Sequence, residues 1–67
     1  MSSRRLKTVL KTLREQRGWS MAQLAKKADV TDAYIAQLET GIRRNPSLQV
    51  LKRLARAFGV PVTELLE

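Results

Sequence analysis

The stretch S-M-A-Q-L-A-K-K-A-D-V-T-D-A-Y-I-A-Q-L-E-T-G, residues 20–41, decides the fold of this chain. Its first half predicts a short helix, because Ser20 and Gln23 have the spacing of a capping box, in which each side chain binds the other residue's backbone N–H. Thr31 is a favourable N-cap for a second helix, and Gly41 suits the left-handed residue that ends a helix. The stretch therefore predicts two short helices joined by a tight turn.

The small and apolar residues of this stretch indicate how the two helices pack. Ala25 lets the second helix approach closely, and Asp29, four residues later, tolerates the left-handed conformation of a turn. Val30, Ile35 and Leu38 then fill the angle between the helices. This spacing is the helix-turn-helix pattern, which projects its second helix into a groove of a partner.

The flanking segments predict three more helices and no strand. The apolar residues that repeat at helical spacing are Leu6, Leu10 and Leu13 before the pair, and Leu48, Leu51, Leu54, Ala55 and Phe58 after it. Ser47 suits the N-cap of the fourth helix, and Pro61 suits the first turn of a short fifth one. The fold class expected is all-α, a compact five-helix domain that spans residues 1–67, in which 1–5 form either a basic arm or a loose tail.

Composition limits the chemistry that the chain can perform. With neither Cys nor His among its 67 residues, it lacks the usual ligands of soft and borderline metals. It also lacks a Gly-rich phosphate loop, so we expect no enzyme, no metal, no cofactor and no small-molecule ligand. No apolar run approaches the ~20 residues of a membrane span and no signal peptide begins the chain, which indicates a cytoplasmic protein.

The charge predicts an anionic partner. The chain carries 13 Lys and Arg against 6 Asp and Glu, a net charge of +7. Basic residues gather in residues 1–17 and 42–56, and they bracket a neutral-to-acidic centre. Such a balance favours nucleic acid first and an anionic membrane surface second.

The chain resembles the lambda-repressor-like, Xre-type helix-turn-helix proteins. The resemblance runs from about Leu6 to Leu66 and is carried by L-R-E-Q-R-G-W-S, Q-L-A-K-K-A-D-V-T, Y-I-A-Q-L-E-T-G, R-N-P-S-L and L-A-R-A-F-G-V-P-V-T-E-L-L. It implies a five-helix fold, usually a two-fold dimer, and a transcriptional regulator or repressor that binds specific double-stranded DNA sequences in prokaryotes and phages. It implies no catalysis. The alternative is an antitoxin or another protein-interaction module of the same fold.

The resemblance places base readers on the third helix. Ile35 and Leu38 face inward, so Asp32, Ala33 and Gln37 lie on the outer face. Gln37 can pair with adenine N6 and N7, Ala33 can touch a thymine methyl group, and Asp32 can accept from cytosine N4. Each has a plainer alternative: a solvated glutamine, a helix-forming alanine, and an acid that complements the helix dipole.

Backbone contacts are expected from the residues that surround this helix. The candidates are Ser20 and Thr31 at helix N-termini, then Tyr34, Arg43, Arg44 and Asn45. Replacement of Arg43 by Ala should accordingly weaken binding to all sequences alike. Family members commonly carry Gln where this chain has Met21, which removes one phosphate contact that the family makes there.

Two further groups are assigned to structure and assembly. Glu39 is rotated only about 40° from the inward Ile35 and needs a partner, and the resemblance suggests that Arg14 provides it as a structural ion pair.

Apolar residues near the C-terminus exceed what a short helix can bury. Val62, Leu66 and Ile42 are therefore candidates for a homodimer interface.

Overall fold

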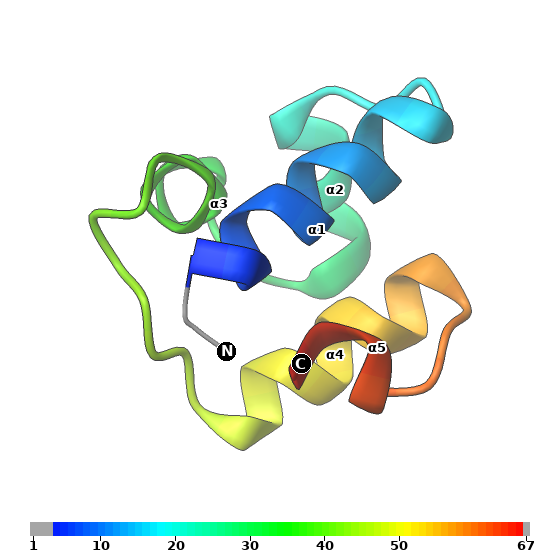
Figure 1. Ribbon diagram of the computed structural model, residues 1–67. Helices are drawn as coiled ribbons and strands as arrows, with labels where there is room; N and C mark the ends of the chain where they lie inside the picture. Colours follow the sequence, from blue (N-terminus) through cyan, green and yellow to red (C-terminus); the bar gives the residue numbers. More distant parts are fainter. Residues whose placement is uncertain (1–3, 67) are drawn as a thin grey trace.

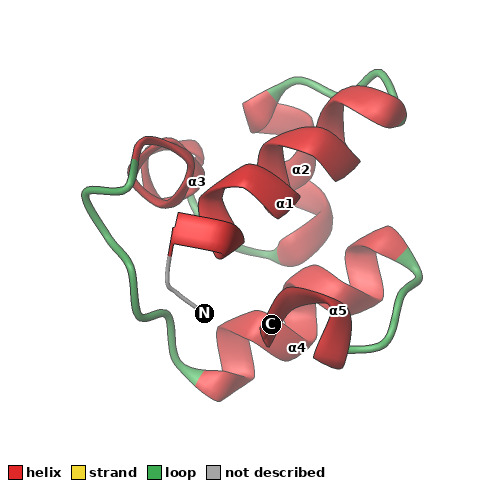
Figure 2. Ribbon diagram, in the orientation of Figure 1, coloured by secondary structure: helices red, strands yellow, loops and turns green. Residues whose placement is uncertain are grey.

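Five helices and no strand make up the part of the chain that the structure describes. The computed structural model describes the backbone of residues 4–66 and the side chains of residues 6–66. The helices are α1 (Arg4–Gln16), α2 (Met21–Ala28), α3 (Asp32–Thr40), α4 (Leu48–Phe58) and α5 (Thr63–Leu66), as Figures 1 and 2 show. The all-α, five-helix prediction is confirmed.

Local side-chain chemistry fixes the helix ends where the sequence predicted them. The capping box is complete: Gln23 donates its backbone N–H to Ser20 Oγ at 3.1 Å, and Ser20 donates its own to Gln23 Oε1 at 2.7 Å. Thr31 caps α3 through a bond from Tyr34 N at 3.1 Å. Asp29 follows α2 in the left-handed conformation at φ 60°, and it is the one non-glycine residue of the described chain with a positive φ. These caps satisfy backbone groups that the short helices would otherwise leave unpaired.

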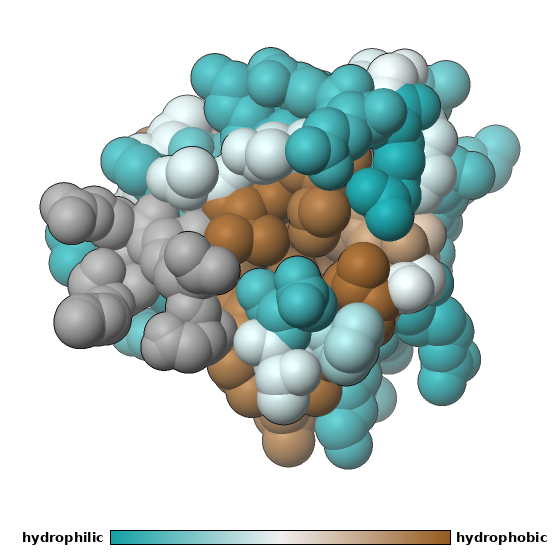
Figure 3. Space-filling model, turned by 45° about the vertical axis from the view of Figure 1, so that its right-hand side comes forward, coloured by the Kyte–Doolittle hydropathy of each residue, from teal (hydrophilic) through white to brown (hydrophobic). Residues whose placement is uncertain are grey.

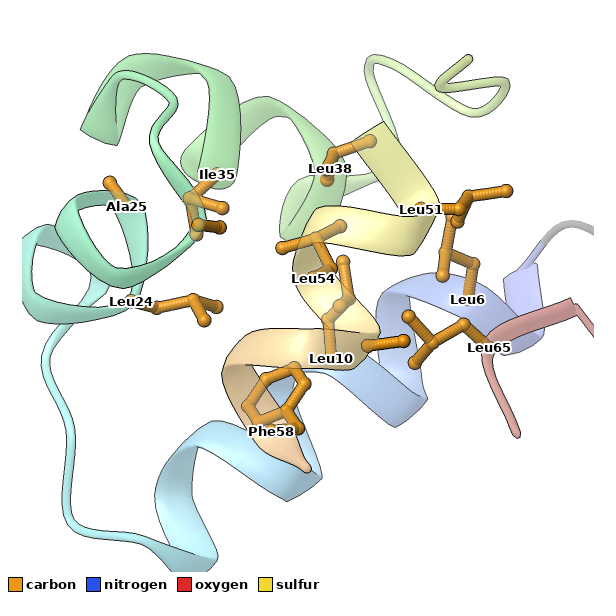
Figure 4. Packing of buried hydrophobic residues seen from close by; sticks show 12 residues of the cluster. Leu6, Leu10, Leu24, Ala25, Ile35, Leu38, Leu51, Leu54, Phe58 and Leu65 are labelled. Carbon is orange, nitrogen blue, oxygen red and sulfur yellow. The ribbon is translucent and has the colours of Figure 1, made fainter. Parts of the chain in front are cut away.

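The core lies where the first four helices meet, and Leu65 from α5 joins it. Leu10, Leu24 and Leu54 come from α1, α2 and α4, are fully buried, and point toward one another in Figure 4. From α3, Ile35 and Leu38 enter the same cluster as expected. Figure 1 shows α3 at the edge of the helix assembly, beside the loop that leads to α4.

Two expectations about the surface need correction. The helical spacing of Leu48 with Leu51, Leu54, Ala55 and Phe58 predicts that it faces inward on α4, yet it is 55% exposed. It is the first residue of α4, and helical spacing gives its angle around the axis without showing whether another element covers that turn. Residues 4 and 5 also belong to α1 rather than to an arm, since arginine is a good helix former and nothing interrupts the helix there.

Residues 1–3 lie outside the described residues. Lys7 lies on α1 against the end of α3. A Cβ atom added at Gly41 would meet Lys7 Cδ at 3.3 Å. A lysine at that place complements the negative end of the α3 dipole.

Candidate nucleic-acid interface

The outer face of α3 presents small and polar side chains. Asp32 and Ala33 are exposed and Gln37 is half-buried, whereas Ile35 and Leu38 on the inner face are buried. Ala33 and Gln37 are four residues apart in the helix, so they are neighbours on one face. The structure therefore brings the three expected base readers together on one accessible surface.

The loop after α3 folds back onto this face through Arg43. The Nε–H of Arg43 donates to Gln37 Oε1 at 3.0 Å, and its backbone N–H donates to the Gln37 carbonyl oxygen, also at 3.0 Å. The guanidinium carbon lies 4.9 Å from the centroid of the Tyr34 ring, within the range of a cation–π contact. We call Tyr34, Gln37 and Arg43 the Arg43 cluster.

Sequence reasoning missed this cluster because it assigned Gln37 to a base and Arg43 to a phosphate independently. The available signal was the predicted helix end at Gly41. A left-handed residue there, at φ 87°, reverses the chain and returns the next residues toward the last turn of the helix.

The remaining backbone candidates surround α3. Ser20 and Thr31 are exposed, and both side-chain oxygens already accept a capping bond. Arg44 and Asn45 are exposed in the loop and make no hydrogen bond, ion pair or ring contact within the described part of the chain. Arg44 thus offers a full set of guanidinium donors to an anion.

Met21 shows what replaces the glutamine that the resemblance expected. It is the first residue of α2, is half-buried, and packs against the hydrophobic core. A thioether has no N–H to donate, so this position contributes packing in place of a phosphate contact.

The expected pair of Arg14 and Glu39 is present and joins α1 to α3. Arg14 Nε lies 2.7 Å from Glu39 Oε2, and Arg14 Nη2 lies 3.0 Å from Glu39 Oε1, which is a bidentate arrangement. A third bond runs from Arg14 Nη1 to the Trp19 carbonyl oxygen at 2.7 Å. The side chains are 11% and 2% exposed. The bond to Glu39 raises the pKa of Arg14 above its ordinary value, although burial acts in the opposite direction.

Arg17, the residue that follows α1, also binds other groups of the domain. Arg17 Nη2 donates to the Phe58 carbonyl oxygen at 2.7 Å. Its guanidinium lies 5.8 Å from the ring of Trp19 and 5.2 Å from that of Phe58, and these two rings stack with centroids 5.7 Å apart. Lys27 lies 4.8 Å from the Trp19 ring. Sequence reasoning counted Arg17 only as part of the basic flank.

The three interface candidates differ in exposure. Ile42 is 78% exposed and Leu66 is 55% exposed, while Val62 is half-buried and packs against the core. Figure 3 shows a face on which apolar side chains form a band between hydrophilic ones. Ile42 and Leu66 are therefore the two candidates with apolar area left to cover.

Residues 4–66 contain neither a candidate metal-ion site nor a helix that could span a membrane. They contain no group of three or more acidic, His or Cys residues that could hold a metal ion. None of their helices is long and apolar enough to cross a membrane.

The arrangement is that of a helix-turn-helix domain. A tight turn joins α2 to α3, and the outer face of α3 is left accessible. The family model of the helix-turn-helix proteins matches residues 10–65. The chain belongs to this family, in its lambda-repressor-like, Xre-type branch.

Known relatives share the domain. The chain is 34% identical over 59 residues to the HTH-type transcriptional regulator SlrR of Bacillus subtilis (strain 168), a match that covers 88% of this chain and 39% of SlrR. It superposes on the N-terminal DNA-binding domain of SinR from Bacillus subtilis with a TM-score of 0.90 at 31% identity, covering 96% of this chain and 93% of that one. For SinR in complex with DNA the TM-score is 0.88 at 32% identity, with coverage of 92% and 98%. The chain spans about half or less of the curated relatives it matches.

Proposed function

We propose that the protein is a transcriptional regulator that binds specific sequences of double-stranded DNA with α3 in the major groove. The observation that carries this proposal is the outer face of α3, where Asp32 and Ala33 are exposed and Gln37 is half-buried, bordered by the basic loop at Arg43 and Arg44. An α-helix fits the major groove, where each base pair has a distinct set of donors, acceptors and methyl groups. The similarity to SinR, which has been solved in complex with DNA, supports the same use of this domain.

Each exposed group has a place in this arrangement. Gln37 would pair with adenine, Ala33 would touch a thymine methyl group, and Asp32 would accept from cytosine N4. The free N–H groups at the start of α2 and α3, next to Ser20 and Thr31, would bind phosphates. The side chains of Tyr34, Arg44 and Asn45 would add to those backbone contacts, which fix the position of the protein without reading sequence.

We further propose that the protein binds as a homodimer on a pseudo-palindromic operator. The domain measures 27 Å along its longest axis, whereas successive major grooves on one face of DNA are about 34 Å apart. One copy with a single α3 therefore cannot read two successive grooves. Ile42 and Leu66, with part of Val62, would supply the apolar contact between copies. The relatives come from bacteria and a Bacillus phage, which supports a bacterial or phage origin and a cytoplasmic location.

The test is in vitro selection of bound duplexes from a random pool, followed by binding of the winner at several salt concentrations. We expect one site with two related half-sites. If only unspecific binding with a steep salt dependence remains, the proposal is wrong. An antitoxin or other protein-interaction module would give that result and would instead bind a protein partner tightly.

Replacement of Gln37 by Ala sharpens this test. We expect a loss of ~1–3 kcal/mol in discrimination at one base pair of each half-site, because one direct base contact disappears. Gln49, an exposed glutamine on α4, gives the control: Gln49→Ala should leave the selected sequence and the affinity unchanged. A selected site that is identical for wild type and Gln37→Ala would contradict the assigned orientation of α3.

A further inference from the structure

We propose that Arg43 is a specificity-determining positioning residue, which fixes the orientation of the Gln37 side-chain amide toward the base edge. This inference rests on the proposed function and deepens it. It also changes the role expected for Arg43 from sequence, which was contact with a phosphate alone.

The geometry determines which end of the Gln37 amide meets Arg43. A guanidinium group has only donors, so the amide atom 3.0 Å from Arg43 Nε must be the oxygen. The opposite orientation would place the amide NH2 group against another donor. Contact with Arg43 therefore excludes one of the two amide orientations that a free glutamine can adopt.

Two more contacts keep Arg43 in place over the last turns of α3. Its backbone N–H binds the Gln37 carbonyl oxygen, which anchors the start of the loop to the helix. Its guanidinium lies over the Tyr34 ring, one helical turn before Gln37. The side chain is thus held at both ends, and it holds Gln37 in turn.

The fixed orientation has a consequence for base recognition. The Gln37 NH2 group keeps both donors, and Oε1 keeps one of its two lone pairs. A donor beside an acceptor in one fixed order matches adenine N7 and N6, approached from one direction. Without Arg43, the amide can rotate to reverse that order and can meet other bases. Arg43 keeps the N–H groups of both terminal nitrogens, which can still bind a phosphate.

The experiment compares Arg43→Ala with Arg44→Ala on the selected duplex and on duplexes changed at the base pair that Gln37→Ala identifies. Both arginines are exposed, and an alanine at 43 keeps the backbone bond to Gln37. We expect Arg43→Ala to reduce discrimination at that base pair by ~3-fold to ~10-fold, the effect of freeing one ordered side chain. Arg44→Ala should lower affinity for all the duplexes by a common factor.

Two further variants test the mechanism. Arg43→Lys keeps the charge but loses the planar fork, so it should retain more affinity than Arg43→Ala and still lose discrimination. In the Gln37→Ala background, Arg43→Ala should cause no further loss of discrimination. Without DNA, 15N relaxation of the Gln37 side-chain amide should show greater mobility in Arg43→Ala than in the wild type or Arg44→Ala.

The outcomes separate the two proposals. If the wild type selects a site and Arg43→Ala weakens binding to all duplexes equally, Arg43 contacts phosphate only and the positioning role is wrong, while the proposed function stands. Unchanged amide mobility in Arg43→Ala would overturn the positioning role in the same way. If the wild type selects no site, the proposed function fails, and the specificity role falls with it.

Discussion

Two arginine clusters, one at the end of α1 and one after α3, use the same side chain in different ways. At the end of α1, Arg14 and Arg17 donate to a buried carboxylate and to backbone carbonyl oxygens. After α3, Arg43 donates to an accessible glutamine side chain, and Arg44 has no partner among residues 4–66. The first cluster connects helices, and the second leaves its donors available to a ligand.

This difference changes how the net charge is interpreted. The basic segment of residues 1–17 includes Arg14 and Arg17, and the fold supplies acceptors for both: the Glu39 carboxylate for Arg14, as expected, and the Phe58 carbonyl oxygen for Arg17. A polyanion would have to compete with bonds of 2.7 Å to groups fixed by the core. In the loop after α3, by contrast, the guanidinium of Arg44 and the terminal nitrogens of Arg43 remain available to an anion beside Gln37.

The largest effect that tests this comparison should come from Arg14→Ala. The substitution leaves the Glu39 carboxylate almost fully buried without its cation, which costs roughly 3–5 kcal/mol in unfolding free energy. A domain of this size has little more stability than that.

Urea denaturation followed by circular dichroism measures the loss, with Lys11→Ala, an exposed site on the same helix, as control. The double variant Arg14→Met/Glu39→Leu should recover much of it. Equal stability of Arg14→Ala and Lys11→Ala would contradict a structural role.

The pH dependence of this pair follows from the raised pKa of Arg14. A group whose pKa is raised by folding contributes fully below its pKa in the unfolded chain, and its contribution is lost only as pH rises through the folded value. The difference in unfolding free energy between wild type and Arg14→Ala should therefore not decrease from about pH 7 to about pH 10. Parallel urea titrations at these two pH values measure it.

Local chemistry explains why so much of the fold was predictable. Ser20, Thr31 and Asp29 act within three or four residues of their own positions, so sequence spacing alone fixes their bonds. Glu39 could be assigned a buried place because helical rotation relates it to Ile35. The Arg17 contact with Phe58 joins residues 41 positions apart, and no local rule relates them. Arg43 was missed for a different reason, because its contact with Gln37 depends on the path that the chain takes after Gly41.

Arg17→Ala should lower the stability of the domain by less than Arg14→Ala does. It removes the bond to the Phe58 carbonyl oxygen at the end of α4 and a cation next to the stacked rings, at a cost of ~1–2 kcal/mol in stability. Trp19 is the only tryptophan, so its fluorescence reports the change directly. Lys52→Ala, an exposed cation on α4, should change stability by less than ~0.5 kcal/mol. Base discrimination by the folded variant should match the wild type. A change in discrimination without loss of stability would place Arg17 in the DNA interface instead.

The smallest effect on stability concerns Asp32, the one carboxylate on the outer face of α3. Thr31 already caps α3, so Asp32 is not needed as a cap and contributes to the helix through the dipole, by ~0.3–1 kcal/mol. If it also accepts from cytosine N4, Asp32→Asn should abolish one cytosine preference, because the amide can donate as well as accept. Thr31→Ala is the contrasting variant.

Thr31→Ala should cost ~0.5–2 kcal/mol in stability through loss of the cap and leave base preference unchanged. Selection with each variant, next to its unfolding free energy, separates the two roles. If Asp32→Asn selects the wild-type sequence, Asp32 acts only on its helix, and base reading rests on Ala33 and the Arg43 cluster. A lost preference would show that the negative charge serves recognition at a place where phosphates oppose it. The basic loop after α3 then has to compensate that repulsion, so Arg44→Ala should weaken binding less in the Asp32→Asn background than in the wild type.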